Sequence, residues 1–200
     1  MFDELSLHIL DVAMNSLAAQ ARVVQITVLE SRKRDWLIVR IRDDGRGMEE
    51  SELRRVLERG RSGKEGRKRP IGLGLALLRQ TSEMCGGHFH VRSAPGQGTT
   101  VTASMRWSHV DRPPLGDLKT TMLALCISNP TVDVRLTYRS DGQRMCFSSQ
   151  ELIRKSESAR EPQDGARLPS SSDFLASKNS RARPESRPAL GRILGGEAVE

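Results

Sequence analysis

Apolar and polar residues alternate in four short segments of the first half of the chain. In the segment 36–43, Leu37, Val39 and Ile41 fall on one side and charged residues on the other, a pattern typical of a strand with one buried face. Similar alternation predicts further strands at 23–30, 88–93 and 99–107. The polar link 31–35 is short enough to join the first two strands as a hairpin.

An amphipathic helix precedes these strands. Between residues 4 and 21 the apolar positions, among them Leu5, Ile9 and Val12, recur every three or four residues and form a wide apolar stripe. Two further helices fit at 49–58 and 73–85. Residues 1–108 are therefore expected to form one domain with a core of ordinary size.

Asp43 continues the apolar side of its strand, so the two-residue period points its carboxylate into the core. A buried carboxylate is costly unless hydrogen-bond donors meet it there. The next residues place Gly45 and Gly47 around an arginine, and glycines let the backbone turn tightly and approach a ligand. This combination suits a ligand with an N–H donor, such as the amino group of adenine. An ordinary turn is the alternative.

A second glycine motif, Gly72-Leu73-Gly74-Leu75, opens a helix. Glycines there free the first amides, which together with the helix dipole form an anion site. The preceding segment 59–71 holds three glycines and six basic residues, including Lys64, and has too few apolar residues to pack. It suits a mobile lid over phosphates. The alternatives are a solvated basic loop and glycines that only ease the chain into a helix.

Three polar residues line one side of the first helix. His8, Asp11 and Asn15 are spaced three and four residues apart and therefore stack along the helix. Asn15 offers a neutral oxygen and Asp11 a charged one, a suitable pair for magnesium bound to a triphosphate. The alternative is that the line is a solvated face, and we expect His8 to be a surface or packing residue.

Thr99 is predicted to face the core at the end of its strand, as Asp43 does. Its hydroxyl is expected to hydrogen-bond the Asp43 carboxylate and orient it toward a base. The alternative is that Thr99 is present only because β-branched residues favour strands.

In this order, the motifs resemble those of the histidine-kinase-like ATPase superfamily, which includes gyrase, Hsp90, histidine-kinase and mismatch-repair ATP-binding domains. The similarity covers about Leu5 to Trp107. It comprises an asparagine box around Asn15, a first glycine box at 43–48, a second at 71–75 and a closing Gly98-Thr99 pair.

The resemblance implies an α/β fold, a two-layer α/β sandwich with helices on one face of a mixed, largely antiparallel sheet and with ATP between helices and lid. It makes Asp43 the adenine-binding residue, Asn15 the magnesium ligand and Asp11 a candidate general base. The remaining nucleotide-binding positions follow from the boxes, the lid and the closing strand: Gly45, Gly47, Met48, Lys64, Gly72, Leu73, Gly74, Leu75 and Thr99.

Two departures from the family pattern bear on activity. Gyrase-like ATPases and anti-sigma kinases carry glutamate where this chain has Asp11, and the shorter side chain argues against efficient hydrolysis. The phenylalanine-containing box of many sensor kinases is replaced by the sequence 56–59, and the lid is short.

The second half of the chain changes character. A helix at 115–128, started by Pro113-Pro114, and a hairpin of 132–138 with 144–147 form a small α-β-β extension, 109–152. This extension cannot bury a core alone, so we expect it to pack on the ATP-binding domain or on a partner. Residues 153–200 are expected to be a disordered basic tail.

The charge and the cysteine content limit the classes of partner and the cellular compartment that fit this sequence. The net charge is +7, and much of the excess is assigned to the lid and tail rather than to a helix or strand face. Nucleic acid is an unlikely main partner because no aromatic platform accompanies the charge. The three cysteines have no metal or disulfide spacing and are expected to be buried thiols in a reducing compartment. No signal or membrane-spanning run is visible, so a cytoplasmic protein is expected.

Three functions fit this sequence. The first is a soluble signalling protein kinase that uses ATP and Mg²⁺ to phosphorylate a separate partner protein, and a homodimer is left open. The second is a regulator whose partner surface is gated by ATP without phosphoryl transfer, and the third is a slow ATPase. The segment around His109 resembles a phosphoacceptor box, but Pro113-Pro114 prevents a continuous helix there, so we expect a linker with Asp111 near the next helix cap.

Overall fold

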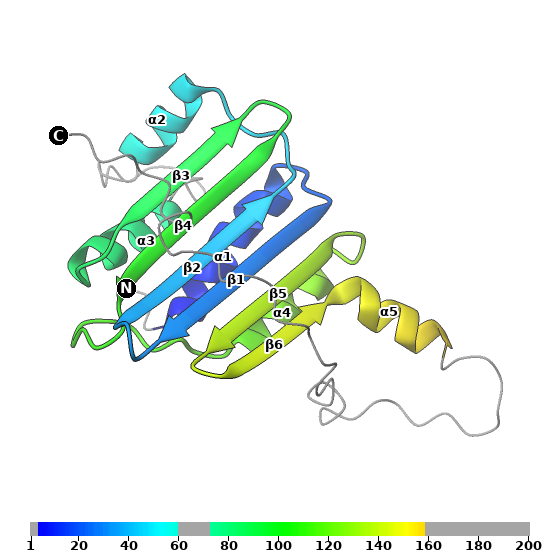
Figure 1. Ribbon diagram of the computed structural model, residues 1–200. Coiled ribbons are helices and arrows are strands. Elements are labelled where there is room, and N and C mark those ends of the chain that lie inside the picture. The colour runs from blue at the N-terminus through cyan, green and yellow to red at the C-terminus, as the bar shows by residue number, and fades with distance from the viewer. Residues whose placement is uncertain (1–3, 60–72, 159–200) are drawn as a thin grey trace. The chain divides into compact units, whose positions relative to one another are not determined.

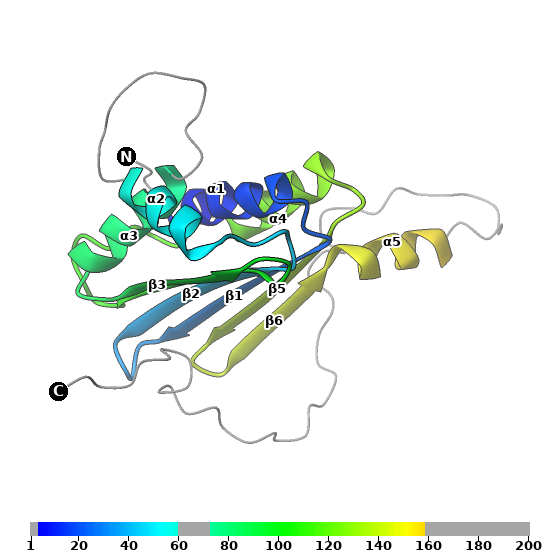
Figure 2. The same cartoon turned by 90° about the horizontal axis from the view of Figure 1, so that it is seen from above.

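A mixed six-stranded sheet with helices packed on one face forms the body of the protein (Figures 1 and 2). The computed structural model describes residues 4–59 and 73–158. Its elements follow the chain in this order: α1 (Leu5–Ala18), β1 (Val23–Ser31), β2 (Trp36–Asp43), α2 (Glu50–Arg59), α3 (Leu73–Met84), β3 (Phe89–Ala94), β4 (Gly98–Arg106), α4 (Leu118–Ser128), β5 (Asp133–Ser140), β6 (Gln143–Ser148) and α5 (Ser149–Ser158).

The sheet has the strand order β3-β4-β2-β1-β5-β6. All neighbouring strands are antiparallel except β1 and β5, which run parallel. The predicted α/β sandwich with a mixed, largely antiparallel sheet is therefore confirmed. The predicted strands lie within a residue or two of the observed ones.

The core lies between the helices and one face of the sheet. Side chains at alternate positions of the central strands point to the helices and are almost fully buried, as the two-residue period predicts: Val24, Ile26 and Val28 of β1, and Leu37, Val39 and Ile41 of β2. From α1, the side chains of Leu5, Ile9 and Val12 meet this face. The apolar stripe predicted for the first helix is thus its buried side.

The extension completes the sheet and does not form a separate layer. β5 pairs with β1 along its whole length, with Val24 opposite Val134 and Ile26 opposite Leu136. The chain divides into two compact units, and the first, Met1–Leu152, includes α4, β5 and β6. Of the second, Ile153–Glu200, only the end of α5 is described. Residues 153–158 are helical there, so the predicted disorder is wrong for them, and residues 159–200 lie outside the described part.

The start of α4 differs from the sequence prediction. The helix begins at Leu118, and Asp117 caps it by accepting hydrogen bonds from the amides of Lys119 and Thr120 at 2.9 and 3.1 Å. Asp111 is therefore not the cap. The carbonyl of Pro114 instead accepts from the amide of Leu5 at 2.9 Å, which ties the linker to the first turn of α1.

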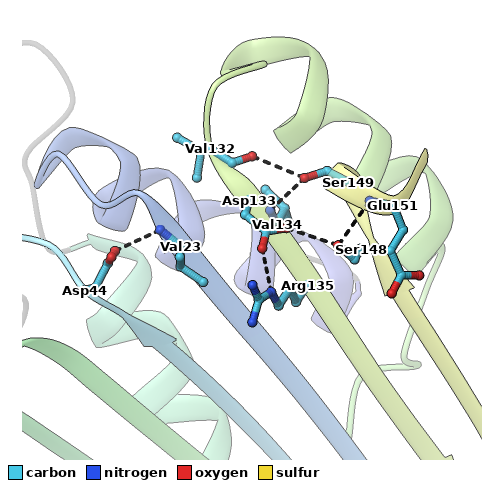
Figure 3. A network of polar contacts seen from close by, with 9 residues as sticks. All are labelled: Val23, Asp44, Val132, Asp133, Val134, Arg135, Ser148, Ser149 and Glu151. Carbon is cyan, nitrogen blue, oxygen red and sulfur yellow. Dashed lines mark hydrogen bonds and ion pairs between the residues drawn. The ribbon is translucent and has the colours of Figure 1, made fainter. Parts of the chain in front are cut away.

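A polar network holds the first turn of α5 to the start of β5 (Figure 3). Ser149 accepts from the amide of Val134 at 2.9 Å and donates to the carbonyl of Val132 at 3.2 Å. The buried carboxylate of Asp133 accepts from Ser148 at 3.2 Å and pairs with Arg135. These bonds satisfy polar groups at the end of the sheet that burial would otherwise leave costly.

The three cysteines differ in how far they are exposed. Cys85 is buried and Cys126 half-buried, but Cys146 is exposed, so the expectation of a buried thiol is wrong for Cys146. Among the described residues, no helix has both the length and the apolar composition needed to cross a bilayer.

Candidate functional site

Asp43 ends β2 with its carboxylate in the interior, only 7% exposed, as the strand period predicts. Its Oδ1 accepts hydrogen bonds from the amides of Gly45 at 3.0 Å and Thr99 at 3.1 Å. Its Oδ2 accepts from the hydroxyl of Ser16 at 2.7 Å. Each carboxylate oxygen has about two lone-pair sites, so Oδ2 keeps capacity for one further donor.

Ser16 was not recognised in the sequence as part of the site. It lies on α1 and is 4% exposed. The signal was available, because Ser16 follows Val12 by four residues and Ile9 by seven, which places it on the buried stripe. A buried hydroxyl on an apolar stripe needs an acceptor, and Asp43 is that acceptor.

Thr99 holds Asp43 through its backbone amide rather than through its side chain. The predicted hydroxyl contact is wrong, because the Thr99 Oγ1 lies 2.9 Å from the Oγ of Ser93 instead. Ser93 also accepts from the amide of Met48 at 2.9 Å. The two hydroxyls thus connect the start of β4 to the loop after β2.

The loop after β2 is tied to several parts of the chain. At the start of β1, Asp44 accepts from the amides of Arg22 and Val23, both at 2.8 Å. Figure 3 shows the contact with Val23. The amide of Arg46 donates to the carbonyl of Ala19 at 3.0 Å, and the carbonyl of Arg46 accepts from Gly96 at 2.7 Å. A loop held in this way presents a preformed backbone to a ligand.

Glycine is required at two places around Asp43. Gly47 has φ +64°, and a Cβ there would lie 1.9 Å from the carbonyl oxygen of Ala94. Gly98 has φ +77°, and a Cβ would lie 2.1 Å from the carbonyl oxygen of Asp43. Any side chain would therefore force the loop and the start of β4 apart.

A pocket of about 350 Å³ opens beside Asp43, in the size range of small-molecule sites. Its walls come from α1, α2, the loop after β2, α3 and β4. Of the predicted nucleotide-binding residues, it brings together Asn15, Asp43, Gly47, Met48, Leu75 and Thr99. The rest of the wall combines apolar residues with polar and charged ones. The apolar residues are Val12, Ala18, Ala19, Val56 and Val101, and the others are Ser16, Arg46, Glu52 and Arg55.

The polar line on α1 is not a solvated face. His8 is 1% exposed, so it is a packing residue, and burial lowers its pKa while nearby Asp11 opposes the shift. Asp11 and Asn15 are half-buried. The side-chain nitrogen of Asn15 is buried and has no hydrogen-bond partner among the described residues, although Asn15 lines the pocket.

Asp11 lies against the first turn of α3. A Cβ on Gly74 would come within 1.8 Å of Asp11 Oδ2, so a larger residue at position 74 would require this carboxylate to move. A carboxylate near a helix N-terminus is stabilised by the helix dipole. Of the other predicted residues, Gly45 is buried beside Asp43, whereas Lys64 and Gly72 lie outside the described residues, and Leu73 starts α3.

No group of three or more His, Cys, Asp or Glu side chains that could hold a metal is present in the described ranges 4–59 and 73–158. A magnesium ion at Asn15 would therefore need most of its ligands from phosphate oxygens and water, as is common for this ion in nucleotide sites. The donors present fit that kind of site.

Residues 2–109 match the family described as histidine kinase-, DNA gyrase B- and HSP90-like ATPase. The chain is 30% identical over 105 residues to virulence sensor protein BvgS of Bordetella bronchiseptica and 34% identical over 83 residues to sensor histidine kinase DcuS of Escherichia coli K12. These alignments cover 50% and 42% of this chain but only 8% and 15% of the two relatives. The chain thus spans a small part of the length of these curated relatives.

Solved structures of related folds resemble it at a lower level. The MutL ATPase domain of Aquifex aeolicus, complexed with ADP, aligns with a TM-score of 0.44 at 16% identity, covering 78% of this chain and 68% of that one. A histidine kinase domain from Erythrobacter litoralis aligns with a TM-score of 0.36 at 25% identity, covering 50% and 45%.

Proposed function

Because the chain belongs to the family of histidine kinase-, DNA gyrase B- and HSP90-like ATPases, we propose that its pocket binds ATP with Mg²⁺ and that the protein is a signalling kinase that phosphorylates a separate partner protein. The observation that carries the nucleotide site is the buried Asp43 carboxylate on the pocket wall, held by donors on both oxygens. The Oδ2 of Asp43 has capacity for one further donor, and the adenine amino group supplies one.

The pocket walls support this assignment. Val12, Met48 and Val101 present apolar surface, which favours a flat purine ring. In the proposed pose, the base lies near Asp43 and the phosphates run toward Asn15 and the N-terminus of α3. Gly74 and Leu75 there, with Gly72 and Lys64 before them, are the proposed phosphate contacts.

Magnesium is proposed to sit at Asn15 beside the phosphates. When bound, the ion would neutralise charge on the phosphate oxygens. On the protein side, Asn15 offers its amide oxygen. Its side-chain nitrogen, which has no hydrogen-bond partner within the described ranges, can donate to a phosphate or a water.

The position of Asp11 favours a second candidate, an ATP-gated binding regulator without phosphoryl transfer. As a general base, Asp11 would have to reach the attacking hydroxyl or water. Its carboxylate instead packs against Gly74 at the start of α3. In the regulator, ATP would change the position of α3, and Asp11 would respond to that change through its contact with Gly74. A third candidate, the slow ATPase, would release free phosphate from ATP.

One experiment separates these functions. The protein is incubated with γ-labelled ATP and Mg²⁺, with and without candidate partner proteins, and label is scored on the chain, on the partner and as free phosphate. Label on a partner is expected for the kinase. ATP binding with no transfer and no free phosphate would reject the kinase in favour of the regulator, and free phosphate alone would identify a slow ATPase.

A further inference from the structure

The sheet has one face that helices α1 to α4 leave open (Figure 2). Residues paired directly across antiparallel strands point to the same side, so the register shows which side chains lie there. Val28 pairs with Val39 and faces the helices, whereas Gln25 pairs with Arg42 and faces the open side. Exposed arginines from β2, β4, β5 and β6 share this open side: Arg42, Arg106, Arg135, Arg139 and Arg144, called here the arginine face.

Two of the five arginines of the arginine face have an acidic partner. Asp133, the one acidic residue that the described strands place on this side, pairs with Arg135, and Asp35 in the turn before β2 lies 3.9 Å from Arg106. Among the described residues, Arg42 and Arg139 form no ion pair. The five arginines come from strands that are far apart in the sequence, and the pairing of these strands brings them to one side of the sheet.

An apolar strip lies among these arginines. Leu29 of β1 pairs with Ile38 of β2 on one side and with Arg139 of β5 on the other. Leu29 and Trp36 are half-buried and present the accessible apolar surface of the strip, whereas Ile38 is buried, with 4% of its surface exposed. Apolar side chains surrounded by arginine are typical of protein–protein interfaces. Single-stranded nucleic acid needs a series of stacking aromatics, and the described positions of this side offer Trp36 at one end and His90.

We propose that the arginine face is a docking surface for an acidic surface of a partner protein. Complementary charge attracts such a partner and orients it. A second copy of this chain would bring the same positive charge, so self-association through this face is disfavoured. Arg42 and Asp43 are adjacent on β2 and point to opposite sides, so a protein on the arginine face leaves the pocket accessible. The docking surface does not depend on ATP binding.

The test measures binding of the full chain to a fluorescent poly-L-glutamate peptide and to a DNA duplex by anisotropy, without ATP and across a salt series. The variant Arg42→Gln/Arg139→Gln should bind the peptide about fivefold or more weakly, because two exposed charge contacts are lost. The control Arg54→Gln/Lys119→Gln removes the same charge from α2 and α4 and should bind as the wild type does.

Amide NMR locates the peptide on the molecule. Shifts are expected in β1, β2 and β5, for example at Thr27 and Thr137, which lie between the arginines. The proposal is overturned if the wild type does not bind, if both double variants weaken binding equally, or if shifts avoid these strands. Tighter binding of duplex DNA that is lost in Arg42→Gln/Arg139→Gln would instead identify a nucleic-acid surface.

Discussion

Asp43 illustrates how single residues determine the chemistry of the pocket. Its Oδ1 is occupied by two backbone amides, whereas its Oδ2 accepts one hydroxyl. The amides are fixed by the loop and by β4, so the carboxylate cannot rotate without losing them. Oδ2 is consequently the oxygen that remains for a ligand donor.

We predict that Asp43→Asn weakens ATP binding by about 1–3 kcal/mol, because an amide nitrogen would then face either the ligand donor or the backbone amides. Calorimetry with ATP and Mg²⁺ measures the loss. Asp44→Asn, the same chemical change one residue later, is the control and should keep the affinity, because Asp44 binds the start of β1. Wild-type affinity in Asp43→Asn would reject the adenine site.

Substitutions of Asn15 and Asp11 should distinguish metal binding from catalysis. Asn15→Ala is expected to abolish magnesium-dependent ATP binding or turnover, because it removes the proposed metal ligand. Asp11→Asn should keep binding and lower turnover if Asp11 is a base. ATP binding and the release of labelled phosphate are both measured on the same preparation of each variant. Unchanged turnover in Asp11→Asn would favour the ATP-gated regulator.

His8 should make stability depend on pH. Burial holds its native pKa below the ordinary value of 6.5, so below that pH the unfolded chain takes up a proton that the native chain does not. The contribution of neutral His8 to the free energy of unfolding is fully present above pH 6.5, and it is lost as the pH falls toward the native pKa. The fall in urea midpoint between about pH 7.5 and about pH 5.5 should be smaller in His8→Gln than in wild type.

The control for this prediction is His88→Gln, which changes an exposed histidine and should keep the wild-type pH dependence. An NMR titration of wild type that gives His8 an ordinary or raised pKa would contradict the prediction.

At the scale of elements, β5 is the strand that joins the extension to the ATP-binding part. It lies parallel to β1, and its helix-side residues continue the rows of the core. Parallel neighbours need a long connection, which here contains β2 to β4 and α4. The extension therefore should not unfold separately from the strands before it.

Leu136→Ala tests this integration. Leu136 is 2% exposed and pairs with Ile26, so its truncation should cost about 2–5 kcal/mol of unfolding free energy. Denaturant unfolding should remain a single transition at a lower midpoint. Thr137→Ala, the next residue on the opposite face, is the control and should change the midpoint little. Two separate transitions in Leu136→Ala would contradict a single unit.

At the scale of the whole molecule, the length of β4 separates the pocket from His109. Thr99 lines the pocket near one end of the strand, and the amide of His109 donates to the carbonyl of Arg106 at the other end. Seven residues of strand span about 23 Å. His109 is therefore far from the nucleotide site of its own chain.

We accordingly predict no acid-labile phosphate on the chain after incubation with ATP and Mg²⁺. The measurement is whether label on the protein survives treatment with acid and with base. Label that survives base, is lost in acid and disappears in His109→Gln would show that His109 is an acceptor, with transfer between molecules.

Features with a local cause could be predicted from the sequence. The inward direction of Asp43 follows from the two-residue period of a strand, and the stripe of Leu5, Ile9 and Val12 follows from the helical period. The need for glycine at position 47 follows from the turn after the strand. Each depends on residues within a few positions, so the order of motifs was enough to indicate an ATP-binding fold.

Features that join distant segments were decided only by the tertiary structure. Ser16 meets Asp43 across 27 positions, and Val24 meets Val134 through a strand pairing whose register no local pattern specifies. The amide rather than the hydroxyl of Thr99 reaches Asp43 because β4 is placed by its own neighbours. The arginine face likewise forms because separate strands align, and the alternation along any one strand contains no information about which strand lies beside it.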